Sequence, residues 1–137
     1  METPVDCVCF RLRRAARAAS RAYDEQLAPS GIRVTQFSLL SVLMELGSLT
    51  VSELADVAVM ERTTLTRNLR VLEKQDLVSS KPGQDRRQRV VSLTKHGRAT
   101  LKIATPLWRE AQKRMVDGLG APRKQRLLRD LAFTAQL

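Results

Sequence analysis

The clearest chemical pattern in the sequence is a set of threonine and arginine side chains between residues 62 and 75. At about 100° per residue, Leu65, Leu69 and Leu72 share one face of a helix over this stretch. The opposite face and its flanks carry the polar and cationic residues, which are Arg62, Thr63, Thr64, Thr66, Arg67 and Arg70. Hydroxyl and guanidinium groups donate hydrogen bonds to phosphate oxygens and to base edges. A helix that exposes them has the chemistry of a nucleic-acid contact.

A second basic group follows on a predicted hairpin. Residues 82–85, Pro-Gly-Gln-Asp, predict a turn between strands at 77–80 and 88–93. The basic residues around this turn include Arg86, Arg87 and Arg89. Arginines at such a tip fit a narrow minor groove, where the negative potential is enhanced. We expect Asp85 to orient Arg87 by a charge-assisted hydrogen bond, and ordinary turn chemistry is the alternative for this aspartate.

Hydrophobic periodicity and capping residues predict the elements that position these groups. Helices are expected at 5–27, 36–46, from Thr50 over a short stretch, at 62–75, at 95–116 and from 122 to about 134. Thr50 and Glu53 form a capping box, and Thr35 and Thr94 are the expected N-caps of the helices that follow them. The order predicts a mainly α fold with a small β-hairpin wing, in which residues 35–93 form a winged helix-turn-helix.

The composition favours a polyanionic partner. The 137 residues include 24 Lys and Arg against 14 Asp and Glu, which gives a formal charge of +10. Such an excess in a chain of single-domain length is typical of nucleic-acid binding, although many basic proteins bind no polyanion. No apolar run approaches the roughly 20 residues of a membrane span, and no secretory signal is visible, so we expect a cytoplasmic protein that does not enter membranes.

Enzymatic and metal-site patterns are not found. The chain has one histidine and two cysteines, which is too few for a His-rich metal site or a disulfide framework. It contains no phosphate loop, nucleophile elbow or H-E-x-x-H motif. We therefore expect no enzyme activity, no metal and no cofactor. A basic helical adaptor for acidic proteins is the alternative outside nucleic-acid binding.

Several short motifs resemble the MarR family of bacterial transcription regulators. They are Leu54-Ala55, Arg62-Thr63-Thr64-Leu65-Thr66-Arg67, Leu72-Glu73-Lys74-Gln75-Asp76-Leu77-Val78, Asp85-Arg86-Arg87 and Leu93-Thr94-Lys95-His96-Gly97. The D-x-R wing followed by L-T-x-x-G is the most specific combination, and the resemblance covers nearly the whole chain. Asp76 stands where the family usually has glycine. Aspartate tolerates the left-handed backbone conformation better than most residues, so we expect the fold to accommodate it.

The resemblance implies a homodimer that binds a pseudo-palindromic operator in double-stranded DNA. Residues 1–34 would form an N-terminal dimerisation helix, 35–93 the DNA-binding domain and 94–137 the C-terminal dimerisation helices, together making one compact unit. It also implies repression, relieved by a small phenolic or other aromatic ligand or by oxidation. In such relatives the ligand lies between the dimerisation region and the DNA-binding domain.

The N-terminal cysteines raise a second sensing hypothesis. Cys9-Phe10 resembles the peroxide-sensing members of the family, and Tyr23 matches one of the tyrosines that hold their reactive cysteine. The other expected tyrosine is Arg13 here, and Phe37 stands where an aromatic hydroxyl from the partner chain is expected. Cys9 and Tyr23 are thus candidate redox-sensor residues. The favoured alternative is that Cys7 and Cys9 are small apolar residues on a buried stripe.

Overall fold

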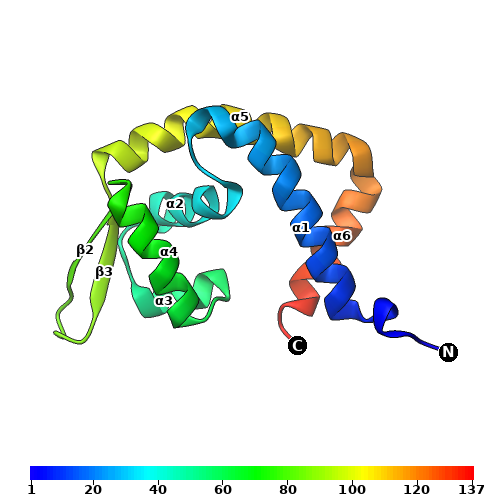
Figure 1. The fold of residues 1–137 in the computed structure, drawn as a ribbon, viewed down its shortest axis with the longest axis horizontal. Helices are drawn as coiled ribbons and strands as arrows, with labels where there is room; N and C mark the ends of the chain where they lie inside the picture. Colours follow the sequence, from blue (N-terminus) through cyan, green and yellow to red (C-terminus); the bar gives the residue numbers. More distant parts are fainter.

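The computed structural model describes all 137 residues (Figure 1). The helices are α1 (Val8–Leu27), α2 (Val34–Leu46), α3 (Val51–Ala58), α4 (Arg62–Lys74), α5 (Lys95–Leu119) and α6 (Ala121–Thr134). The strands are β1 (Leu49–Thr50), β2 (Val78–Pro82) and β3 (Arg89–Leu93), and short 3-10 turns at Pro4–Asp6 and Ala28–Ser30 flank α1. All six predicted helices and the predicted hairpin are confirmed, with ends that differ by a few residues.

The molecule is an arch whose crossbar is the long helix α5. The helices α2, α3 and α4 and the three strands form a lobe at one end of α5, which we call the winged lobe (residues 34–93). Helix α6 and the N-terminal half of α1 lie at the other end of α5, and we call these two segments together the arm. Both chain termini lie in the arm (Figure 1). No helix combines the length and apolar content that crossing a membrane would need.

The winged lobe contains a three-stranded antiparallel sheet with the order β1-β3-β2. β2 and β3 form the wing, with Ser80 opposite Val91 and Pro82 opposite Arg89. The sequence did not predict β1, a two-residue strand that pairs with β3 through Leu49 and Thr50. Such a short segment has no periodicity of its own, and its strand conformation comes from the distant partner strand.

Leucine side chains from every large element of the winged lobe meet in one core. Leu40 of α2, Leu54 of α3, and Leu65 and Leu72 of α4 have no exposed surface, and Val91 of β3 is 1% exposed. The predicted apolar face of α4 is therefore confirmed. Because Leu65, Leu69 and Leu72 occupy the inward face, the polar side chains between them must point outward.

The start of α2 differs from the prediction. The helix begins at Val34 with Arg33 at the N-cap position, so Thr35 lies inside the first turn and is not the cap. The backbone N–H of Val34 donates instead to the carboxylate of Asp24 on α1, at 2.7 Å. A side chain distant in sequence thus satisfies a free N–H group at this helix end, which local cap rules do not detect.

The junction between the wing and α5 explains the Leu-Thr-x-x-Gly pattern. The Thr94 hydroxyl accepts a hydrogen bond from the backbone N–H of Gly97 (2.9 Å), which confirms Thr94 as the N-cap, and donates to the carbonyl of Asp76. A Cβ on Gly97 would lie 2.1 Å from the carbonyl oxygen of Leu77, so only glycine permits this approach. Asp76 has a φ of 56°, which confirms the expected left-handed conformation.

Candidate nucleic-acid interface

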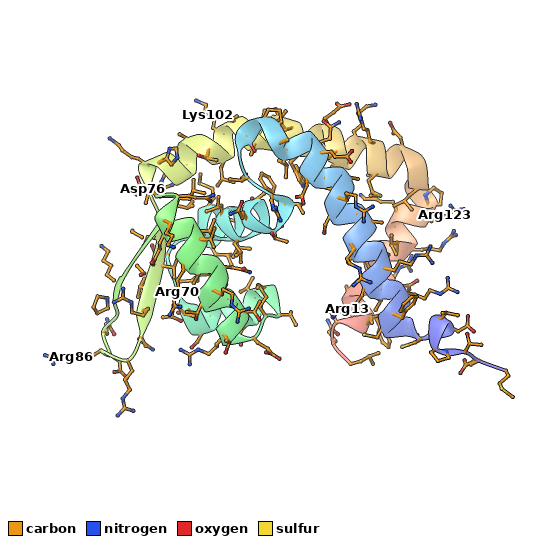
Figure 2. The ribbon with its side chains drawn as sticks, viewed as in Figure 1. Arg13, Arg70, Asp76, Arg86, Lys102 and Arg123 are labelled. Atoms are coloured by element: carbon orange, nitrogen blue, oxygen red, sulfur yellow. The ribbon has the colours of Figure 1, made fainter.

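The residues that the sequence singled out lie on one side of the winged lobe. All of the predicted contact residues on α4 and on the wing are exposed. We call this set the basic face: Arg62, Thr63, Thr64, Thr66, Arg67, Arg70, Arg86, Arg87 and Arg89. Figure 2 shows Arg70 on α4 and Arg86 projecting from the tip of the wing. Thr63 and Arg67 lie opposite the buried leucines, and the other α4 residues flank them.

No acidic side chain forms an ion pair with an arginine of the basic face. The three ion pairs of the chain are Arg11–Asp6, Lys113–Asp117 and Arg114–Glu110, all outside the winged lobe. The guanidinium groups of α4 and the wing therefore keep their charge available at close range for an anionic partner. An exposed cluster of unneutralised cations produces a local positive potential that attracts polyanions.

Asp85 makes a different contact from the one predicted. Its carboxylate accepts a hydrogen bond from the backbone N–H of Arg87, at 3.1 Å, and it forms no ion pair with the Arg87 guanidinium. This is turn chemistry of the Asx type, the alternative interpretation of this residue. Asp85 thus shapes the loop that carries Arg87 and leaves the guanidinium free.

A cleft of about 370 Å³ separates α4 from the wing. Its walls carry the side chains of Arg62, Arg70 and Arg89, together with Thr66 and Glu73. One guanidinium nitrogen of Arg89 donates to the Ser80 hydroxyl at 3.0 Å, and that hydroxyl donates to a carboxylate oxygen of Glu73 at 2.5 Å. Neither Ser80 nor Glu73 stands out in the sequence, because their contact crosses from a strand to a helix.

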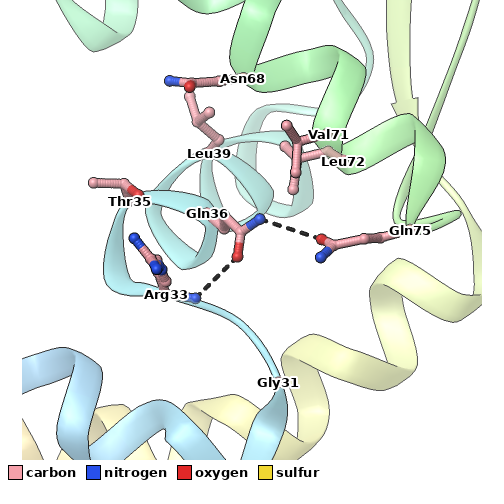
Figure 3. Close-up of a pocket in the computed structure, with 9 residues that line it drawn as sticks. All are labelled: Gly31, Arg33, Thr35, Gln36, Leu39, Asn68, Val71, Leu72 and Gln75. Atoms are coloured by element: carbon pink, nitrogen blue, oxygen red, sulfur yellow. Dashed lines mark hydrogen bonds between the residues drawn. The ribbon is translucent and has the colours of Figure 1, made fainter.

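A second hollow, of about 400 Å³, lies on the other flank of α4, against the start of α2 (Figure 3). The Gln36 amide nitrogen donates to the Gln75 side-chain oxygen at 3.2 Å, and the Gln36 oxygen accepts from the backbone N–H of Arg33 at 3.0 Å. Asn68 and Leu39 line the same hollow. The two glutamines tie the C-terminal end of α4 to the N-terminal end of α2.

Aromatic side chains join the winged lobe to the crossbar. Phe37 of α2 is buried and stacks on Trp108 of α5, with ring centroids 5.7 Å apart. Tyr23 of α1 donates from its hydroxyl to the side-chain oxygen of Gln112 on α5. Partial burial raises the pKa of Tyr23, so its phenol stays a neutral donor at physiological pH. These contacts lie where α1, α2 and α5 meet, between the lobe and the arm.

The cysteines do not lie on a buried stripe in the single chain. Both Cys7 and Cys9 are exposed free thiols at the start of α1. Tyr23 is 14 residues further along the same helix, a separation of about 21 Å at 1.5 Å per residue. Cys9 and Tyr23 of one chain therefore cannot touch, and any contact between such residues requires a second chain.

The arm carries apolar side chains that nothing in the chain covers. Helix α6 has no buried residue, and its Leu128 and Phe133 are 52% and 66% exposed. Val8 at the start of α1 is 68% exposed, and Phe10 is also accessible. Exposed apolar side chains gathered in this way mark an interaction site.

The chain resembles known proteins in both sequence and structure. The sequence model of the MarR family matches residues 32–88. A crystal structure of the transcriptional regulator MosR from M. tuberculosis in complex with DNA superposes with a TM-score of 0.87. MosR is 45% identical to this chain, and the superposition covers 95% of this chain and 94% of MosR.

Two Bacillus subtilis proteins are similar over a shorter range. The HTH-type transcriptional regulator YwoH is 33% identical over 85 residues, which is 62% of this chain. The organic hydroperoxide resistance transcriptional regulator is 31% identical over 91 residues, which is 66% of this chain. The chain spans 62% of the length of each of these two relatives.

Proposed function

The chain belongs to the MarR family of DNA-binding transcriptional regulators, and we propose that it acts as a homodimeric repressor that binds a pseudo-palindromic operator. The observation that carries this proposal is the basic face, in which α4 and the wing present unpaired arginines on one side of the winged lobe. B-DNA's major groove admits one helix of this size, and a hairpin beside it reaches the neighbouring backbone or minor groove.

Each part of the basic face takes a distinct role in this proposal. Arg67, on the outward side of α4, reaches guanine O6 and N7, and Thr63 and Thr64 contact phosphates or thymine methyl groups. Arg86 and Arg87 at the wing tip enter the minor groove or contact the DNA phosphate backbone. Arg62, Arg70 and Arg89 around the cleft supply positive charge to a phosphate.

The arm supports the homodimer. In the proposal residues 1–34 and 94–137 form the dimerisation region, and residues 35–93 form the DNA-binding domain. The exposed side chains of α6 and the start of α1 would be covered by the same surfaces of a second copy. A twofold dimer places two copies of α4 about one helical turn of DNA apart, so the operator is pseudo-palindromic.

A small aromatic effector would release the repressor by acting between the arm and the winged lobe. The Phe37–Trp108 stack lies at this junction, and aromatic rings there favour a flat aromatic ligand. A ligand that changed the packing of α2 on α5 would alter the distance between the two copies of α4. Two recognition helices with the wrong separation cannot enter successive major grooves together.

Selection from random duplexes tests the repressor proposal and identifies the operator at the same time. The full chain is incubated with a pool of random-sequence duplexes, and the bound DNA is sequenced and footprinted. We expect an inverted repeat whose halves are protected about one helical turn apart. A panel of simple phenols and hydroxybenzoates should release the selected duplex. Binding that shows no sequence preference would contradict an operator-specific repressor.

Thiol sensing is a second candidate for the release signal. Cys7 and Cys9 are free and exposed, and a 31% identical relative is an organic hydroperoxide resistance regulator. An oxidant reaches an exposed thiol readily. Under this alternative Cys9 of one copy is the sensor, and Tyr23 acts from the partner copy.

A hydroperoxide titration separates the two signals. Cumene hydroperoxide is added to the complex of the protein with its selected duplex, and release is compared for the wild type and Cys9→Ser. If Cys9 is the sensor, the wild type is released and Cys9→Ser stays bound, whereas Cys7→Ser serves as the matched control and behaves as the wild type. Equal release of the wild type and Cys9→Ser would eliminate Cys9 as the sensor.

A further inference from the structure

We propose that Glu73 and Ser80 are positioning residues that fix the Arg89 guanidinium in the cleft between α4 and the wing, where it binds one backbone phosphate of the DNA. This inference rests on the proposed DNA-binding function and adds two residues to it. Neither residue carries a positive charge, and one of them is acidic, so neither would be chosen as a DNA-contact residue from its side-chain type alone.

The hydrogen bonds form a chain from helix to strand to strand. A carboxylate oxygen of Glu73 on α4 accepts from the Ser80 hydroxyl on β2, at 2.5 Å. The same hydroxyl accepts from one terminal nitrogen of Arg89 on β3, at 3.0 Å, and the Ser80 carbonyl oxygen lies 3.5 Å from that nitrogen. Since a hydroxyl donates one hydrogen and accepts through its lone pairs, Ser80 can serve both partners at once.

The strand register explains why Arg89 faces α4. Ser80 pairs with Val91 and Pro82 pairs with Arg89, so side chains at 80, 89 and 91 point to the same side of the wing. Val91 on that side is 1% exposed and packs into the core. Ser80 and Arg89 continue the same side beyond the edge of the core. They therefore face the flank of α4 that carries Glu73 and Arg70, across the cleft.

The chain of contacts leaves most of the guanidinium free. Arg89 forms side-chain hydrogen bonds only with Ser80, and both of these bonds involve the same terminal nitrogen of its guanidinium. The remaining N–H donors are available to an anion in the cleft, which Arg62 and Arg70 also line. A side chain that is held before binding loses less conformational freedom when the phosphate arrives, so its contribution to affinity is larger.

The proposal predicts that truncation of Glu73 changes DNA affinity in the direction opposite to that expected from charge repulsion alone. An acidic residue beside a DNA backbone normally weakens binding by repulsion, so its removal should strengthen binding. If Glu73 holds Arg89 in place through Ser80, its truncation weakens binding even though a negative charge is lost. Glu61, at the N-cap of the same helix, has no side-chain cap hydrogen bond and provides a matched acidic control.

The affinity of the protein for one duplex of arbitrary sequence, used for all variants, tests the proposal. A phosphate contact does not depend on the DNA sequence, so no operator is needed. The full-length variants are titrated at several salt concentrations by fluorescence anisotropy, and circular dichroism confirms that each is folded. Ser80→Ala and Glu73→Ala should each weaken binding roughly fivefold, the expected effect of one positioning hydrogen bond. Glu73→Gln keeps the acceptor and should bind at least as tightly as the wild type. Glu61→Ala should bind as tightly as the wild type or more tightly.

A double variant isolates the role of Arg89. Arg89→Ala should lower the magnitude of the slope of log K against log salt by about 0.9, the value for one phosphate. In the Arg89→Ala background, Ser80→Ala should have no further effect. The proposal is overturned if Glu73→Ala binds as tightly as the wild type, or if the losses from Ser80→Ala and Arg89→Ala add. Either result would leave the proposed DNA contacts of Arg67 and Arg87 unaffected. The proposed function itself would be refuted if the wild-type protein bound no duplex.

Discussion

Phe37 of α2 and Trp108 of α5 stack with their ring centroids 5.7 Å apart and their planes inclined by 20°. Phe37 is buried and Trp108 is half-buried, so the pair fixes the winged lobe to the crossbar. In a dimer built through the arm, the angle of the lobe on α5 sets where each copy of α4 meets the DNA. In the proposed dimer the stack would therefore link the arm to the proposed DNA contacts.

Trp108→Ala should destabilise the protein by about 2 kcal/mol, because the half-buried indole and its stacking contact are lost. Urea unfolding at one fixed protein concentration, followed by circular dichroism, measures the change. Trp108→Phe retains a ring against Phe37 and is the matched control, with about half of that loss. Equal stability of Trp108→Ala and the wild type would show that the stack does not hold the lobe.

Arg87→Ala should weaken binding to every DNA sequence alike. Its guanidinium is exposed on the wing, and Asp85 contacts only its backbone N–H, so the side chain is free to contact the backbone or minor groove. Loss of one phosphate contact lowers the magnitude of the salt slope by about 0.9. Anisotropy titrations with the selected operator and with random duplex provide the comparison. A loss confined to the operator would contradict the proposed role.

Arg67→Ala should have the opposite profile, with a loss concentrated on the operator. Arg67 points away from the buried Leu65 and Leu69 on the outward side of α4, where a base contact is possible. Removal of a bidentate base contact costs about 1–3 kcal/mol of discrimination. The ratio of operator to random-duplex affinity measures it, with Arg67→Lys as the charge-preserving control. A ratio equal to that of the wild type would place Arg67 on the backbone.

Leu131→Lys should dissociate the proposed dimer. Leu131 is 40% exposed on α6, on the same side of the helix as Leu127 and Leu128. A charge buried without a partner at an interface costs several kcal/mol. Sedimentation velocity should show a monomer for Leu131→Lys and a dimer for Gln125→Lys, which adds the same charge outside the apolar side. If Leu131→Lys sediments as a dimer, α6 is not the interface.

The sequence predicted those elements whose structure is determined locally. The leucines of α4 recur at helical spacing, the Thr50–Glu53 capping box forms as expected, and Asp76 adopts the left-handed conformation. The basic face followed directly, because burial of one side of α4 leaves the other side exposed. Whether each of its residues contacts DNA stays a prediction.

The features that the sequence did not predict depend on contacts between distant segments. β1 is a strand only because Leu49 and Thr50 pair with β3. The start of α2 is capped from α1 by Asp24, and Arg89 is held by Ser80 and Glu73 across two strands and a helix. Asp85 was assigned the wrong contact, since sequence spacing does not distinguish a backbone N–H from the side chain of the same arginine.

The mass of the complex formed on the selected duplex tests the central claim most directly. Analytical ultracentrifugation at low salt, with protein in excess, gives the number of chains per duplex. If two copies join through their arms and each presents α4 and a wing, the complex contains two chains on one inverted repeat, and a duplex with a single half-site binds far more weakly. One chain per duplex, with equal affinity for the half-site and the full repeat, would contradict the account.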